Sequence, residues 1–141
     1  MIGKTGVHAI RALTQLTGLP EGQSLGAAQI AEKIDAPPNY LAKLLRILAR
    51  QGLVESHKGP GGGFRLARDA RRIRLLDVVE PIEPMTRWNR CILRQKDCMD
   101  GDPCAIHERW KQLRDGYLAM LAETTIADLD PRAESPLKDH R

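Results

Sequence analysis

The feature that most limits the possible fold is a pair of short segments whose apolar residues recur with helical spacing. Two prolines separate these segments. The first segment lies in residues 27–34, and the second helix is predicted to begin at about Pro38, where a proline suits the first turn. The break falls at Asp35-Ala36-Pro37-Pro38, because each proline disfavours helical conformation in the residue before it. Gly52 fits the left-handed position that ends such a helix. The spacing therefore predicts two helices joined by a tight turn.

A glycine-rich hairpin is predicted directly after these two helices. Residues 54–56 and 64–66 alternate as short strands on either side of the turn Gly59–Gly63. A further helix is expected over residues 5–16, and Pro81 ends the last element of the unit. The fold predicted for residues 1–80 is mainly α with a small β-hairpin wing, that is, a winged helix-turn-helix.

A long helix is predicted after a cysteine-containing loop over residues 81–103. Asp102 is a suitable N-cap, and Pro103 is a suitable first helical residue. The apolar positions form a heptad stripe that suits pairing with another helix: Ile106, Trp110, Leu113, Tyr117 and Met120. This helix and a short following one are expected over residues 104–129, and a disordered polar tail over residues 130–141.

The charge is divided unevenly along the 141 residues, whose formal net charge is +4. Residues 1–75 contain 12 Lys and Arg against 5 Asp and Glu, whereas residues 76–141 contain 10 against 13. A basic first half attracts polyanions, chiefly nucleic acid, although a solvated basic face without a partner remains the plain alternative. No apolar run is long enough to cross a membrane and no signal-peptide pattern is found, so we expect a cytoplasmic protein.

The second helix of the predicted pair carries the candidate DNA-reading residues. If its leucines face the core, the outward positions are Asn39, Tyr40, Lys43, Arg46 and Arg50. Such a helix fits the major groove of DNA, where Asn39 would read an adenine edge and Lys43 or Arg46 a guanine or a phosphate. Tyr40 would donate to a phosphate or pack on a sugar.

The wing supplies a second set of candidate contacts. Its residues are Lys58, Gly59, Gly61 and Gly62. Glycine lacks a Cβ, so the backbone of this turn can approach the sugar-phosphate chain closely. The competing interpretation of both sets is a basic amphipathic helix followed by a plain hairpin.

Three cysteines and a histidine lie within 17 residues, as Cys91-x6-Cys98-x5-Cys104-x2-His107. An odd number of cysteines is unsuited to a disulfide framework. The helix N-terminus favours the Cys104 thiolate, and His107 lies on the same helical face. Thiolates select zinc, Cu(I) or iron–sulfur clusters, and the spacing does not choose among these or exclude three metal-free cysteines. His8 is another candidate ligand, although a partly buried structural histidine is the plainer interpretation.

These motifs together resemble the Rrf2 family of bacterial winged-helix regulators, which includes iron–sulfur and nitric-oxide sensors. The residues that carry the resemblance are Tyr40-Leu41, Gly52-Leu53-Val54, Lys58–Phe64, Leu66-Ala67-Arg68, the three cysteines, His107 and Trp110. The resemblance implies a homodimer with crossing C-terminal helices on a palindromic operator in double-stranded DNA. It further implies a 2Fe–2S or 4Fe–4S cluster on Cys91, Cys98 and Cys104. The fourth ligand would be His107, or His8 reached from the partner subunit, where other members carry an acidic residue.

The function implied is a repressor whose operator binding depends on a cluster that senses iron, redox state or nitric oxide. One alternative keeps DNA binding but makes the cysteines a metal-free thiol redox switch. Another is a zinc-stabilised structural or adaptor protein. A thiol enzyme with Cys104 as nucleophile and His107 as base lacks any oxyanion-donor or substrate motif, so we expect no enzymatic activity.

Overall fold

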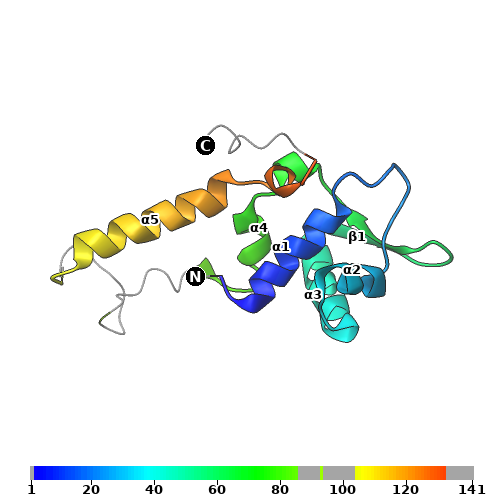
Figure 1. The fold of residues 1–141 in the computed structure, drawn as a ribbon, viewed down its shortest axis with the longest axis horizontal. Helices are drawn as coiled ribbons and strands as arrows, with labels where there is room; N and C mark the ends of the chain where they lie inside the picture. The colour runs from blue at the N-terminus through cyan, green and yellow to red at the C-terminus, as the bar shows by residue number, and fades with distance from the viewer. Residues whose placement is uncertain (1, 86–92, 94–103, 133–141) are drawn as a thin grey trace.

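The computed structural model describes residues 2–85, 93 and 104–132, and its order of elements is that of a winged helix-turn-helix followed by a long helix (Figure 1). The elements are α1 (Lys4–Leu16), α2 (Ala27–Ile34), α3 (Pro38–Arg50), β1 (Val54–His57), β2 (Gly63–Leu66), the 3-10 helix η1 (Ala70–Arg72), α4 (Leu75–Val79), α5 (His107–Glu123) and the 3-10 helix η3 (Ala127–Leu129). The predicted fold class is therefore confirmed.

The turn between α2 and α3 forms where the two prolines predicted it. Asp35 ends α2 in the left-handed conformation, with φ of 55°, and Pro38 is the first residue of α3. The side of α3 that faces the core is a leucine stripe, made of the buried Leu41, Leu44, Leu45 and Leu48. This stripe fixes the rotation of α3 about its axis, so the polar residues between the leucines must face away from the core.

The wing is held against the segment before α2 by contacts of Ser24 and Leu25. Strands β1 and β2 pair antiparallel, with Val54 opposite Leu66. Leu25 adds a bridge to Phe64 on the other edge of β2, through N–H···O bonds of 2.9 and 2.7 Å. The Ser24 hydroxyl donates to the carbonyl of Gly61 at 3.0 Å. The position of the wing is therefore set relative to the start of α2.

Helix α1 lies at the centre of a core that also includes residues from the C-terminal part of the chain. Ala9, Ala12 and Leu13 of α1 are fully buried, and so are Leu121 and Ile126. The segment that follows α5 pairs with the one before α4, because Leu75 N–H donates to Thr124 O and Ile126 N–H to Ile73 O, both at 2.9 Å. The C-terminal end of α5 is thus packed against the winged domain. The N-terminal end of α5 projects away from that domain (Figure 1).

Helix α5 begins at His107, later than the start that Pro103 suggested. Ile106 has a φ of −109° and a ψ of 9°, which is not helical, and His107 N–H donates to the carbonyl of Cys104 at 3.0 Å. Cys104 therefore lies in a turn before the helix rather than inside its first turn. The predicted cap, Asp102, lies outside the described residues.

Asp77 stabilises the start of α4 and makes that helix sensitive to acid. Its carboxylate accepts the Arg74 N–H at 3.0 Å and pairs with the Arg74 guanidinium at 2.8 Å. The side-chain hydrogen bond from Arg74 lowers the pKa of Asp77 below its ordinary 3.8. A carboxyl with a lowered folded-state pKa stabilises the fold above its ordinary pKa, and this stabilisation is lost as pH falls through the folded value.

We expect Asp77→Asn to lower the free energy of unfolding by about 1 kcal/mol at pH 7, since it removes the negative charge at the helix start and the ion pair with Arg74 while keeping an acceptor oxygen. The difference from the unsubstituted protein should shrink as the pH falls below about 4. Urea unfolding followed by circular dichroism, at pH 7 and again below about pH 4, measures this difference in the free energy of unfolding. Glu32→Gln, which changes an exposed carboxylate of α2, is the matched control. A deficit that is the same at both pH values would contradict this assignment.

Candidate DNA-binding surface and cysteine site

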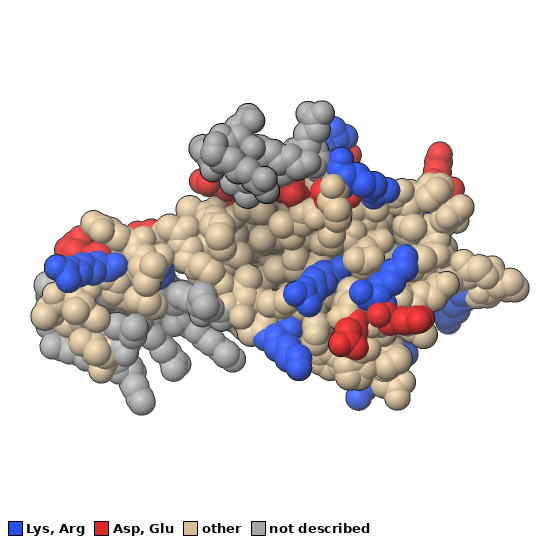
Figure 2. All heavy atoms as spheres, viewed as in Figure 1, with Lys and Arg blue, Asp and Glu red and all other residues tan. Residues whose placement is uncertain are grey.

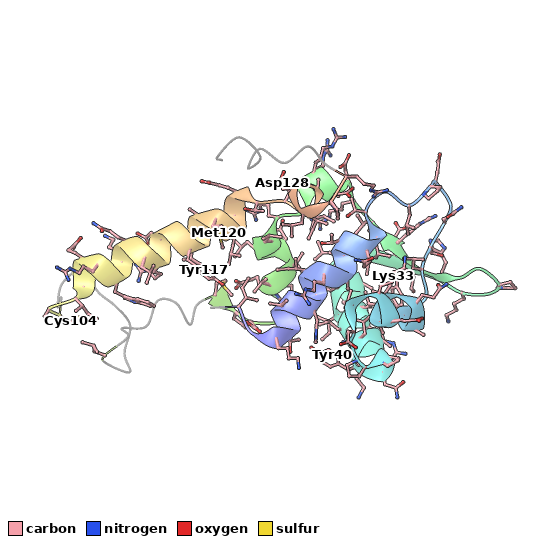
Figure 3. All side chains as sticks on the ribbon, viewed as in Figure 1. Lys33, Tyr40, Cys104, Tyr117, Met120 and Asp128 are labelled. Atoms are coloured by element: carbon pink, nitrogen blue, oxygen red, sulfur yellow. The ribbon has the colours of Figure 1, made fainter. Side chains whose placement is uncertain are left out.

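The exposed side of α3 presents the residues that the sequence predicted. Asn39, Lys43 and Arg46 are exposed, and Tyr40 is half-buried. Tyr40 lies in the first turn of α3 (Figure 3). Within the described part of the chain, no carboxylate pairs with Lys43 or Arg46. These cations are therefore available to an external anion.

The wing glycines divide into two kinds. Gly59 and Gly61 have positive φ angles of 96° and 73°, and a Cβ at either would meet nothing within 4 Å. A Cβ on Gly62, by contrast, would overlap the backbone carbonyls of His57 and Gly59. Gly62 is therefore required by the turn itself, which sequence reasoning missed, and its role at DNA stays a prediction. At Gly59 and Gly61 the space beside the backbone is unoccupied, so DNA could approach the backbone there, next to the exposed Lys58.

Part of the positive charge of the first half is neutralised beyond the wing. Arg71 pairs with Asp69 at 2.8 Å, and Arg74 pairs with Asp77. The side-chain hydrogen bond from Arg71 lowers the pKa of Asp69 to about 2. Figure 2 shows one face of the molecule, on which basic side chains are spread over the winged domain with acidic groups among them. The +7 excess of residues 1–75 is thus not one uniform patch, and the cations of α3 and Lys58 of the wing are among those that form no ion pair in the described part of the chain.

His8 contacts the predicted DNA-reading helix of its own chain. It is only 8% exposed. Its Nδ1 lies 3.4 Å from the Tyr40 hydroxyl, and the two rings meet edge-on with centroids 5.6 Å apart. The flanking Val7 and Ala9 predicted burial, but no spacing in the sequence indicated the partner. The proposed ligand role of His8 toward a partner subunit stays a prediction.

The cysteine site is described only at Cys104 and His107. Cys104 is half-buried just before α5, at the projecting end of the helix (Figure 3), and His107, the first helical residue, is 4% exposed. Cys91 and Cys98 lie outside the described residues. No group of three candidate metal ligands occurs among the residues the structure describes. What is visible is a thiol and an imidazole three residues apart at one helix start, a donor pair suited to thiophilic metals.

The apolar stripe of α5 divides between the molecule and solvent. Tyr117 faces the winged domain, where its hydroxyl accepts the Ile2 N–H at 2.7 Å, and Leu121 is fully buried. Leu113 and Met120 are 66% and 47% exposed. These two residues, one heptad apart, form what we call the open edge of α5.

A helix-turn-helix with an exposed, unpaired basic side and an anchored glycine-rich wing defines a winged helix-turn-helix DNA-binding regulator. Residues 2–131 match the model of the Rrf2 family, described as iron-dependent transcriptional regulators. The chain belongs to the Rrf2 family, and it is a DNA-binding transcriptional regulator rather than an enzyme. The family resemblance found in the sequence is thereby confirmed.

Curated relatives agree with this assignment. An HTH-type transcriptional regulator of Aquifex aeolicus is 32% identical over 124 residues, which cover 86% of this chain and 85% of the relative. The HTH-type transcriptional regulator IscR of Escherichia coli is 31% identical over 124 residues, covering 88% of this chain and 76% of the relative.

Solved structures share the fold. The global cysteine regulator CymR of B. subtilis superposes with a TM-score of 0.77 at 23% identity, covering 95% of this chain and 98% of the other. IscR of T. potens superposes with a TM-score of 0.73 at 23% identity, covering 95% and 88%. In the described part of this chain, no helix is long and apolar enough to span a membrane.

Proposed function

We propose that this chain is a homodimeric cytoplasmic repressor that binds a palindromic operator and whose DNA affinity is set by an iron–sulfur cluster responding to iron, redox state or nitric oxide. The observation that carries the proposal is the placement of α5. Its projecting end begins at His107, directly after the turn that contains Cys104, and its other end is packed into the DNA-binding domain through Leu121. One helix therefore joins the cysteine site to the domain that reads DNA.

The dimer is supported by the open edge of α5. An exposed leucine and an exposed methionine one heptad apart are the pattern of a helix that pairs with a second helix. At 1.5 Å per residue, the 17 residues of α5 span roughly 25 Å, and Cys104 lies just beyond the end of the helix that projects from the winged domain. In a dimer with crossing α5 helices, that distance would bring the cysteine site of one subunit toward the winged domain of its partner.

The donor set supports the cluster. Cys104 and His107 would supply one sulfur and one nitrogen ligand from one helix start, and Cys91 and Cys98 two more sulfurs from the preceding loop. IscR, a relative at 31% identity, and the family description as iron-dependent regulators favour iron–sulfur over zinc. A bound cluster would supply a centre that reacts with oxidants and nitric oxide.

The chain's own residues would convert that chemistry into a change of DNA affinity. The loop over residues 91–104 would close around the ligand and hold the start of α5 in one position. Helix α5 would transmit this position to the winged domain through Leu121 and Ile126. In one state of the dimer, the two α3 helices would lie one DNA turn apart, about 34–36 Å, and could enter two half-sites. In the other state, their separation would not match the operator. A population shift of this kind is sufficient for regulation.

The DNA-binding residues are tested by single substitutions. We expect Lys43→Ala or Lys58→Ala to weaken operator binding and, where the side chain contacts phosphate, to reduce the slope of log affinity against log salt by about one unit per site. Fluorescence anisotropy from 50 to 300 mM salt, with a duplex selected by the protein from a random library, measures both. Arg71→Ala removes the same charge from an ion pair beyond the wing and should leave the slope unchanged. Equal losses for Arg71→Ala and Lys43→Ala would contradict the assignment of α3 as the docking helix.

A further inference from the structure

The first residues of the chain connect α5 to the DNA-reading helix. At the start of α1, the Ile2 N–H donates to the Tyr117 hydroxyl of α5 at 2.7 Å, and the Gly3 N–H donates to the Glu83 carboxylate at 2.8 Å. The Glu83 side chain also fills the space where a Cβ on Gly3 would lie. Both backbone donors precede Lys4, the first residue of α1, so they have no hydrogen-bond partner within the helix. The start of α1 is therefore held by two side chains that follow the wing in the sequence, Glu83 and Tyr117.

His8, in the second turn of α1, extends this connection to Tyr40 in the first turn of α3. The imidazole Nδ1 lies 3.4 Å from the phenolic hydroxyl, and the ring planes are inclined by 73°. His8 is buried, so its ring orientation is fixed by packing, whereas Tyr40 is only half-buried. The contact restricts where the Tyr40 hydroxyl can point. Figure 3 shows Tyr117 on α5 and Tyr40 on α3, and the start of the chain and α1 contact both.

We propose that His8 is a positioning residue for operator recognition, which donates its Nδ1–H to the Tyr40 hydroxyl and so leaves the phenolic proton to donate to a DNA phosphate. The proposal rests on the proposed docking of α3, because Tyr40 must reach DNA for its orientation to matter. Tyr40 is half-buried next to the exposed Asn39 and one turn before the exposed Lys43, so it lies at the border between the core and the exposed side of α3. An ordered donor loses less conformational freedom on binding than a mobile one, and this difference appears as affinity.

Substitutions at His8 distinguish positioning from packing. His8→Asn keeps a polar atom that is three bonds from Cα, as Nδ1 of the histidine is. His8→Leu keeps an apolar side chain of similar size and removes the polar contact with Tyr40. We expect His8→Leu to weaken binding to the library-selected duplex about three- to tenfold, the usual effect of one hydrogen bond, and His8→Asn to restore most of the loss. Tyr40→Phe should weaken binding by a similar factor.

The deciding measurement is the double variant. If His8 acts through the Tyr40 hydroxyl, His8→Leu should have no further effect once Tyr40→Phe is present, so the losses should not multiply. Circular dichroism melting of each variant shows whether the fold is retained, and His8→Asn keeps the test usable if His8→Leu unfolds. Losses that multiply, a Tyr40→Phe variant with unchanged affinity, or His8→Asn no better than His8→Leu would each overturn the proposal. If wild-type protein selects no duplex, or if Lys43→Ala has no effect, it is instead the docking of α3 that fails.

Discussion

Replacing Leu113 and Met120 together with aspartate should convert the protein from a dimer to a monomer. Both side chains are largely exposed in the single chain, at 66% and 47%. Burying an apolar side chain of this size in a helix pair contributes about 1.5–3 kcal/mol. Each dimer would lose four such burials and would instead have to desolvate four carboxylates. An affinity loss of more than about a thousandfold follows, at 1.4 kcal/mol per factor of ten.

Sedimentation velocity at micromolar concentration measures the change directly. The matched control is Leu129→Asp, an exposed apolar residue of η3 outside α5, which should remain dimeric. The winged domain should keep its melting transition, because neither Leu113 nor Met120 belongs to the buried core. A double variant that stays dimeric would show that the subunits pair through another surface, and a monomeric wild-type protein would remove the dimer from the proposed function.

Cys104→Ala should abolish the iron content and the visible absorption of protein purified without oxygen. The unsubstituted protein should show broad visible absorption with iron and acid-labile sulfide. Removing one of three thiolates leaves a ligand set that cannot complete four-coordinate iron at both ends of a cluster. Cys98→Ala should have the same effect. In both variants operator affinity should become the same with and without iron and sulfide reconstitution, because the response depends on the cluster.

Glu108→Ala is the control for this experiment. Its carboxylate lies 4.0 Å from His107 Nε2 but on an exposed side chain, and its removal should keep both the colour and the response. A colourless wild-type protein with one zinc per chain would instead support the structural site. A protein without metal whose DNA affinity responds to peroxide would support the thiol switch. Unchanged affinity with and without the cluster would contradict sensing.

The helix-turn-helix and the wing could be predicted from the sequence because their determinants are local. The prolines at 37 and 38, the leucine stripe of α3 and the glycine run each act within one or two turns of chain. The start of α5 was predicted too early, since the residues before His107 form a turn despite good helix-start residues.

Contacts between distant segments could not be predicted. The burial of Leu121 and Ile126 in the core of the winged domain has no periodic signature, because it depends on where a later helix returns. The same holds for the contact of Tyr117 with Ile2 and of His8 with Tyr40. Gly62 was interpreted as a DNA contact from its glycine neighbours, yet its own turn already requires it. In each case the residue type suggested a role and the tertiary structure supplied the partner.

Because α5 is held at one end and projects at the other, it acts as a lever. Over its roughly 25 Å length, a tilt of about 10° at Leu121 would move Cys104 by about 4 Å. The same lever works in reverse, and coupling between two binding sites is reciprocal. In the proposed dimer, operator DNA that fixes the spacing of the two α3 helices would therefore also change the affinity of the cysteine site for its cluster. A promoter-bound molecule and a free one would then respond to the same signal at different thresholds.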